Sequence, residues 1–144
     1  MKKIAGTLIA LSMFAGTAAA DSIRIDPLML ASGGIGVSYQ YNLDKESAIV
    51  LDHASYKQTI FSSEISLGLT TVTYKKPFSG NNLDQGAYWR AGGGSITTAV
   101  GSLGVSGFGP AAAVGYDHKF NNEWSIQGEF GIGSLSFVRV GYSF

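Results

Sequence analysis

Cysteine is absent from this chain of 144 residues, and charged residues make up only 14% of it. Without cysteine the chain has neither a disulfide framework nor a thiolate metal site. A lipid anchor of the kind that needs a cysteine at the cleavage site is excluded for the same reason. Soluble domains usually contain about a quarter of charged residues, so this composition is unusual for a soluble domain.

Charge is also balanced, because lysine plus arginine and aspartate plus glutamate number 10 each. The chain has no run of like charge, and nothing in it indicates a nucleic-acid partner. After residue 20, no apolar run approaches the roughly 20 residues that a transmembrane helix needs. The sequence offers no motif for a metal ion or a cofactor, and we expect neither.

The N-terminus has the three parts of a secretory signal peptide. A short basic start precedes a mostly apolar stretch, and three alanines ending at Ala20 form a small-residue cleavage site. We therefore expect residues 1–20 to be a signal peptide and residues 21–144 to form one domain.

Apolar residues alternate with polar or small residues through the rest of the chain, which is the period of a β-strand. The alternation is clearest over residues 34–43, where Ile35 and Val37 oppose glycine and serine. Pro27 suggests a bulge or an unpaired N–H in the first strand, and a slip in the alternation near Thr70 suggests a bulge there. The pattern predicts eight strands, at residues 22–29, 34–43, 47–57, 64–74, 87–98, 107–120, 124–132 and 135–144.

An even number of strands fits a closed antiparallel barrel with both chain ends on one side. A soluble barrel has an apolar interior and a charged exterior, whereas an outer-membrane barrel is the reverse. Here the polar faces consist mainly of glycine, serine, glutamine, asparagine and alanine, and the apolar faces carry aromatic residues near turns. These aromatic residues are Tyr39, Tyr41, Tyr116, Trp124, Tyr142 and Phe144. The polarity predicts an all-β, eight-stranded, antiparallel up-and-down transmembrane β-barrel.

The final strand, residues 135–144, alternates strictly and ends on an aromatic residue. It resembles the C-terminal strand of bacterial outer-membrane β-barrels, which usually has a glycine at the position of Arg139. The resemblance covers the whole mature chain and is to the small eight-stranded outer-membrane β-barrel proteins, the OmpA/OmpX-type class. It implies that Tyr142 and Phe144 belong to a signal that is read by the outer-membrane assembly machinery.

The same resemblance implies a monomer that is integral to the outer membrane of a Gram-negative bacterium. Its partners would be outer-membrane lipids and lipopolysaccharide, and no nucleic acid. The C-terminus would be periplasmic, together with the turns at residues 44–46, 80–85 and 119–122. The opposite, extracellular turns are predicted to be short, which leaves little surface for a large adhesive or receptor function.

The interior of the barrel is predicted to contain eight polar residues, Arg24, Asp26, Gln40, Glu64, Arg90, Gln127, Glu129 and Arg139. An eight-stranded barrel is just wide enough for its own side chains, so mixed charges there favour pairing into a network that fills it. The alternative is a polar pathway through a narrow pore. In the last hairpin, a turn centred near Ser134 would place Glu129 directly opposite Arg139.

One local arrangement suggests catalysis, because His53 and Ser55 share a face of one predicted strand. The pair resembles the His-x-Ser of the outer-membrane lipid A deacylases, which implies His53 as base and Ser55 as nucleophile. The asparagine that follows the serine in that family is Tyr56 here, and the nearest acid on the next strand, Glu64, is assigned to the interior. We expect a non-enzymatic barrel with a structural or envelope-integrity role, with a lipid A-modifying hydrolase and a narrow pore as alternatives.

Overall fold

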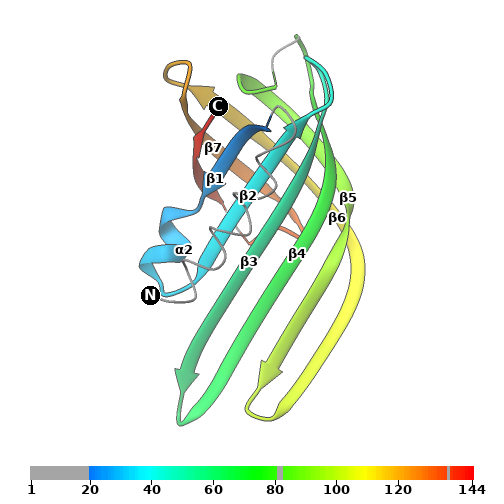
Figure 1. Cartoon of the computed structure of the whole chain (residues 1–144). Helices are drawn as coiled ribbons and strands as arrows, with labels where there is room; N and C mark the ends of the chain where they lie inside the picture. Colours follow the sequence, from blue (N-terminus) through cyan, green and yellow to red (C-terminus); the bar gives the residue numbers. More distant parts are fainter. Residues whose placement is uncertain (1–19, 81–82, 136) are drawn as a thin grey trace.

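The computed structural model describes residues 20–80, 83–135 and 137–144, which form a closed antiparallel barrel in which β8 pairs with β1. The predicted eight-stranded up-and-down barrel is confirmed (Figure 1). Of the expected signal peptide, only residue 20 lies within the described residues. The elements are β1 (Ala20–Ile25), α2 (Pro27–Ala31), β2 (Ile35–Asn42), β3 (Ala48–Ile60), β4 (Ser63–Pro77), β5 (Gly86–Val100), β6 (Leu103–Lys119), β7 (Trp124–Ile132) and β8 (Val138–Tyr142).

The two ends of the barrel differ in their connections. The C-terminus shares one end with the connections after β2, β4 and β6, and α2 lies toward the other end (Figure 1). In the β2–β3 turn, hydrogen bonds from the Ser47 hydroxyl and the Glu46 backbone N–H, both 2.7 Å long, lower the pKa of Asp44. No helix among the described residues is long and apolar enough to cross a membrane.

The segment after β1 is a short helix and not the continuing strand with a bulge that the alternation predicts. Pro27 lies in the first turn of α2, where its missing N–H costs nothing and its fixed φ suits the helix. The Asp26 carboxylate caps the helix by accepting hydrogen bonds from the backbone N–H groups of Leu28 (2.8 Å) and Met29 (2.9 Å). Asp26 is buried, and this capping contact stops the strand at Ile25.

Strands β3 to β6 are longer than the sequence predicts. Residues 58–60 and most of residues 99–106, which were predicted as turns, belong to strands. The β3–β4 hairpin turns on Phe61 and Ser62, both with positive φ (49° and 66°), as a two-residue type I′ turn requires. Small and polar residues at the hairpin tips look like loop sequence but continue the ladder.

The slip in the alternation near Thr70 is not a bulge. The pairing of β3 with β4 runs without a shift from Ala48↔Lys75 to Ile60↔Ser63, and the pairing of β4 with β5 is equally regular. Instead, the inner face of β4 is apolar at Ile65, Leu67 and Leu69 and becomes polar at Thr71 and Thr73. The sequence therefore reports a change in which face is apolar and not a break in the ladder.

Two glycines allow the sheet to bend sharply between β4 and β5. A Cβ atom at Gly92 would collide with the Val72 carbonyl oxygen and lie 2.8 Å from Thr73 Cα. A Cβ atom at Gly94 would likewise collide with the Thr70 backbone. Because only glycine permits this approach, these positions act as the kinks that curve a sheet into a barrel.

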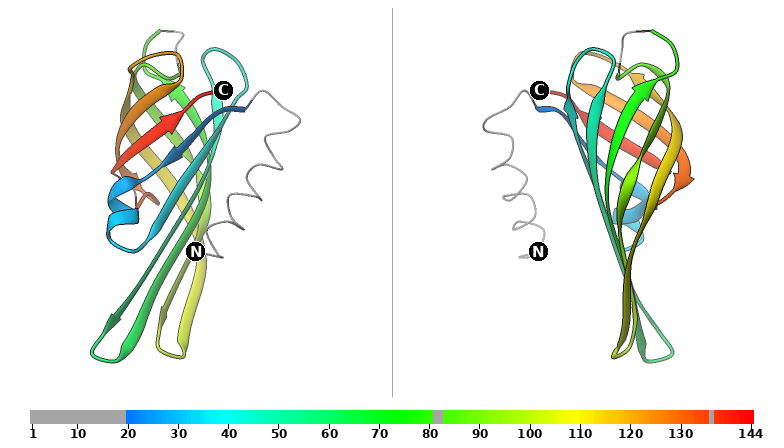
Figure 2. Two further views of the ribbon diagram at one scale, coloured as in Figure 1. Left: turned by 60° about the vertical axis from the view of Figure 1, so that its left-hand side comes forward. Right: turned by 90° about the vertical axis from the view of Figure 1, so that its right-hand side faces the viewer.

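Strands β3 to β6 also project beyond the rest of the barrel as a four-stranded sheet (Figures 1 and 2). β2 pairs with β3 only as far as Ser55, and β7 pairs with β6 only from Ala112. Residues 56–69 and 96–111 form the two hairpins of this projecting sheet, which we call the extension. The extension lies at the end of the barrel opposite the C-terminus (Figure 2).

Candidate functional site

The polar residues assigned to the interior lie in two places. Glu64 is exposed on the outer face near the tip of the extension, where its carboxylate pairs with Lys57 Nζ at 2.7 Å. The prediction of an inward Glu64 is wrong because β4 has no bulge to keep Ile65 on the outer face. The other members are buried: Arg24, Asp26, Gln40, Arg90, Gln127, Glu129 and Arg139.

A ring of four alternating charges fills the middle of the barrel. Arg90 binds the Glu129 carboxylate in a bidentate way, through Nη2–Oε1 (2.5 Å) and Nε–Oε2 (2.7 Å), and also pairs with Asp52. Arg139 completes the ring, with Nη1 at 3.4 Å from Glu129 Oε1 and Nη2 at 3.5 Å from Asp52 Oδ1. Thr73 Oγ1 accepts a further bond of 3.0 Å from Arg90 Nη1. Each charge of the ring therefore touches two of opposite sign.

The register of the last hairpin differs from the predicted one. Arg139 lies directly opposite Gln127, whereas Glu129 was expected there. This pairing centres the hairpin on Gly133, one residue before Ser134, and Gly133 has the positive φ (75°) of a turn. Arg139 and Glu129 still form an ion pair, because both point inward and the long arginine side chain reaches the diagonal neighbour.

A second charged cluster lies nearer to the C-terminal end. Lys75 pairs with Asp117, and both side chains are fully buried. Arg24 Nη2 lies 3.3 Å from Asp84 Oδ1 and 3.9 Å from Asp117 Oδ2. Gln40 Oε1 accepts hydrogen bonds from Arg24 Nη1 (2.8 Å) and Lys75 Nζ (2.9 Å), which joins the two cations through a neutral group.

Tyr88 connects the two clusters. Its hydroxyl donates to Glu129 Oε2 at 2.7 Å, and Lys75 Nζ lies 4.3 Å from the centre of its ring, a cation–π distance. Gly115 makes room for this side chain, since a Cβ atom there would collide with the Tyr88 hydroxyl. Tyr88 thus joins the two charged clusters into one connected set of inward side chains.

The charges of the two clusters balance, and the buried Asp26 carboxylate lies apart from them as the cap of α2. The cations are Arg24, Lys75, Arg90 and Arg139, and the carboxylates of the two clusters are Asp52, Asp84, Asp117 and Glu129. Balanced and paired charges make burial tolerable, whereas an unpaired charge in this environment would be expensive. This arrangement can hold strands together and occupy the lumen; the eight side chains carry no net charge that would attract one kind of ion.

Sequence reasoning missed several members of this network. Asp117 shares the inner face of β6 with small residues, and Tyr88 shares the inner face of β5 with Arg90. Strand parity could therefore have found both. Asp52 and Lys75 were missed because the reversal of polarity along β3 and β4 obscured which face points inward. Asp84 belongs to the connection between β4 and β5 that folds back to the barrel end, and no pattern in the sequence signals this.

His53 and Ser55 lie on the outer face of β3, two residues apart as the sequence predicts. His53 Nδ1 hydrogen-bonds Thr70 Oγ1 at 2.9 Å, on the neighbouring strand. Glu64 shares this face but lies opposite Thr59, six residues along the strand from His53 and therefore on the order of 20 Å away. No ion pair between His53 and a carboxylate occurs among the described residues.

Other candidate chemistry is sparse. Within the described ranges, no three histidine, aspartate or glutamate side chains come together as metal ligands. At the C-terminus, Tyr142 stacks edge-to-face between Trp124 (5.2 Å between ring centres) and Phe144 (5.3 Å). The two residues of the expected assembly signal thus form an aromatic cluster with β7 on the outside of the barrel.

No protein-family model matches the sequence, and no curated protein is significantly similar to it. The fold and the buried network define its structural class on their own. The chain is a small, closed, antiparallel β-barrel of eight strands whose interior contains a charged network.

Proposed function

We propose that this chain is an integral outer-membrane β-barrel with a structural, non-enzymatic role in the cell envelope. One observation carries the proposal: the barrel is polar inside and apolar outside, the reverse of a soluble barrel. The outward side chains of the barrel wall include Ile23, Ile25, Val37, Leu51, Val72, Val114, Phe130 and Val140. In a bilayer these apolar side chains would contact lipid, whereas in aqueous solution they would be exposed to water.

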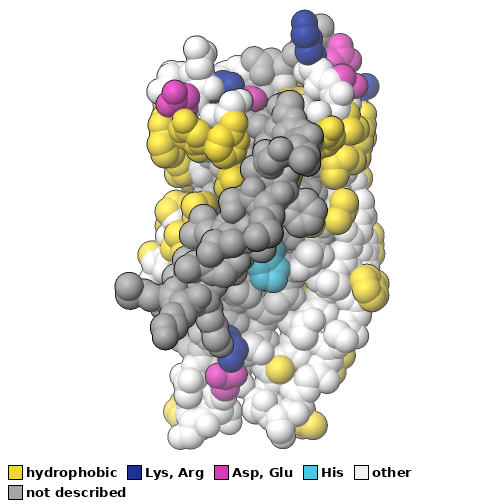
Figure 3. Space-filling model, viewed as in Figure 1, with side chains coloured by type: hydrophobic (Ala, Val, Ile, Leu, Met, Phe, Trp, Pro, Cys, Tyr) yellow, Lys and Arg dark blue, Asp and Glu magenta, His cyan; other side chains and the backbone are white. Residues whose placement is uncertain are grey.

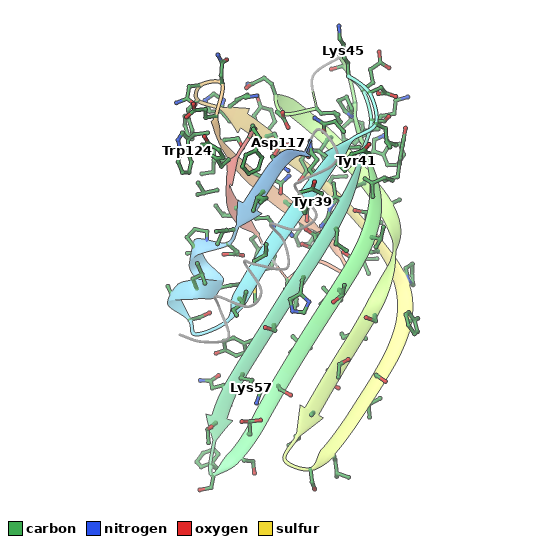
Figure 4. The ribbon with its side chains drawn as sticks, in the orientation of Figure 1. Tyr39, Tyr41, Lys45, Lys57, Asp117 and Trp124 are labelled. Carbon is green, nitrogen blue, oxygen red and sulfur yellow. The ribbon has the colours of Figure 1, made fainter. Side chains whose placement is uncertain are left out.

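The distribution of aromatic and charged residues supports a bilayer position. Tyr39 and Tyr41 on β2 and Trp124 on β7 lie near the C-terminal end of the barrel (Figure 4). In Figure 3 the apolar side chains form a band just below a charged rim at that end, while the opposite part of the visible face has few of them. An apolar band bordered by aromatic residues is typical of membrane barrels, in which such residues sit at the headgroup level.

The paired network supports a structural role over a pore. A conducting lumen needs a continuous water-filled path, and here two paired charge clusters and Tyr88 lie across the lumen. Neither charge sign is in excess among the eight paired side chains. We therefore expect planar bilayers that contain the protein to show no steady conductance above that of protein-free bilayers.

Membrane insertion is tested by folding the protein into lipid vesicles. The folded barrel should float with the vesicles, resist SDS without boiling and migrate differently from the boiled sample on a gel, because closure leaves no free edge in the lipid-facing part. A monomer that stays soluble without detergent and migrates identically in both samples would sink the proposal. The structural role is tested by lipid A mass spectrometry on cells with and without the protein, in which a changed acylation pattern would favour the hydrolase.

A further inference from the structure

The inner face of the extension has a composition opposite to that of the barrel interior. Within the barrel, the inner face of β3 to β6 carries Asp52, Thr73 and Arg90. Toward the hairpin tips, the same face carries Leu67 and Ile96. Regular pairing places the inner residues of the extension and of its base in three rows across the four strands. The rows are Gln58–Ile65–Val100–Leu103, Tyr56–Leu67–Thr98–Val105 and Ala54–Leu69–Ile96–Gly107.

The outer face reverses at the same level. It is apolar at Leu51 and Val72 in the barrel wall but mostly small or polar in the extension, where Phe108 is an exposed exception. The outer rows of the extension and of its base are His53–Thr70–Ser95–Phe108, Ser55–Gly68–Thr97–Ser106 and Lys57–Ser66–Ala99–Gly104. A sheet with one apolar and one polar face is the pattern of one layer in a two-layer sandwich. The extension therefore has the composition of a sheet whose inner face is covered by a second layer.

The two rows nearest the hairpin tips are largely uncovered in the described structure, whereas Ala54 and Leu69, in the row nearest the barrel, are buried. Val100, Leu103 and Val105 are exposed to 55%, 79% and 73%, and Ile65 and Ile96 are also exposed. The three inner rows contain no charged side chain. A contiguous apolar patch of this kind marks an interaction site, and an uncharged patch fits an equally uncharged apolar surface.

The shape of the molecule suggests which surface that is. β3 to β6 extend beyond the shorter side formed by β1, β2, β7, β8 and α2 at the end opposite the C-terminus, so the profile is a step (Figures 1 and 2). The apolar rows face the space beyond the end of this shorter side. A second copy turned by a twofold axis perpendicular to the barrel would place its own extension in this space, with its apolar rows against those of the first.

We propose that the inner face of the extension docks on the same face of a second copy in an apposed membrane. This rests on the proposed membrane location, because that location puts all extensions of one membrane on one side. In one membrane, the inner face of each extension points over the mouth of its own barrel. A parallel neighbour in that membrane therefore cannot bring its inner face against it. Copies in two facing membranes meet head to head, as the twofold arrangement requires. The longer strands thus supply an adhesive surface that short loops would lack.

The size of the surface predicts a weak contact that acts in numbers. Four strands about 4.8 Å apart and three rows about 7 Å apart give an upper bound of roughly 400 Å² per copy, or roughly 800 Å² in total. Stable protein pairs usually bury more than about 1,000 Å². Single barrels in detergent should therefore be monomeric, whereas vesicles that carry many copies should adhere through multivalency.

The test uses vesicles with the full-length barrel and light scattering as the measure of clustering. Orientation is established with Ser102→Cys in the β5–β6 turn, because the chain has no other cysteine for an impermeant maleimide to label. We expect dense proteoliposomes with outward extensions to cluster and Val105→Glu to reduce clustering at least tenfold. The matched control is Ser106→Glu, which adds the same charge to the polar face of the same strand and should leave clustering unchanged.

Three outcomes would overturn the docking proposal. The first is that Val105→Glu and a second inner-face variant, Ile96→Glu, both cluster as the unaltered protein does. The second is that Ser106→Glu loses as much clustering as Val105→Glu. The third is that protein vesicles cluster with protein-free vesicles, which would make lipid the partner. Restored clustering when Val105→Glu vesicles are mixed with Val105→Lys vesicles would support it, since the two faces then attract. Each variant is first checked for heat-modifiable migration and vesicle flotation. If the unaltered protein fails that check, the membrane location is refuted, and the docking that rests on it falls as well. If the unaltered protein passes, the three outcomes above refute the docking alone.

Discussion

At the scale of single residues, Arg90 is the centre of the buried network. Its guanidinium contacts two carboxylates and a hydroxyl at once, with the bidentate geometry that makes arginine–carboxylate pairs strong. The value of such a group lies less in net stabilisation than in the cost of removing one partner. Loss of Arg90 would leave Asp52 and Glu129 facing each other with only Arg139 between them.

We predict that Arg90→Met and Glu129→Gln each lower the free energy of unfolding by on the order of 3–5 kcal/mol, because each leaves a buried charge without its main partner. The double variant should lose less than the sum, since it removes both members of the pair. Urea titration of vesicle-inserted protein, read from gel migration, measures this. Lys57→Met, which breaks an exposed pair, serves as control and should cost at most about 1 kcal/mol. Full additivity of the two single variants would contradict the coupling.

A second residue-scale prediction concerns the cap of α2. Asp26→Ala removes the acceptor for two backbone N–H groups and should cost on the order of 1 kcal/mol of helix stability. Asp26→Asn keeps an acceptor oxygen and should retain most of it. Amide hydrogen exchange at Leu28 and Met29 reports the change locally. Equal exchange rates in both variants would show that the carboxylate oxygen does not hold this helix.

At the scale of elements, the long strands depend on glycine at the bend between β4 and β5. Gly92→Ala forces a Cβ atom into the backbone of the adjacent strand, and overpacking of this kind costs roughly 1–3 kcal/mol. Gly107→Ala, on β6, meets no heavy atom within 4 Å and should be close to neutral. The midpoint of the heat-induced gel shift compares the two. A neutral Gly92→Ala would mean that the sheet can close without this kink.

The alternation of residues predicted the number of strands and their order, because each strand of the barrel wall keeps one polar and one apolar face. The same rule failed at Thr70, where the environment of each face changes along one unbroken strand. Period-two patterns report which face is apolar, and a reversal of that preference looks the same in sequence as a bulge. The helix at Pro27 was missed for a different reason, since five residues are too few to show a helical period.

The candidate site was only partly predictable for related reasons. Inward residues of the clean strands, such as Gln40, Gln127 and Arg139, could be assigned from parity. Asp84 and Lys75, the partners of Gln40, could not, because one comes from a connection and the other from the strand whose polarity reverses. Which inward residues meet depends on the stagger between strands, and this stagger is a property of the closed barrel as a whole.

At the scale of the whole molecule, the reversal of polarity on the outer wall gives the proposed membrane a boundary that substitutions can locate. On β6, Val114 and Ser106 point to the same outer face, but Val114 lies in the apolar barrel wall and Ser106 in the polar extension. Val114→Lys should lower the free energy of unfolding in bilayers by roughly 2–4 kcal/mol if it lies near the midplane, because a lysine there loses its hydration. Ser106→Lys should cost little, since its ammonium group would remain in water. Ala113→Ser, on the inner face beside Val114, should also cost little, because a small hydroxyl can be accommodated among polar side chains. Urea titration in vesicles measures all three variants, and an equal cost at Val114 and Ser106 would mean that no bilayer boundary separates the barrel wall from the extension.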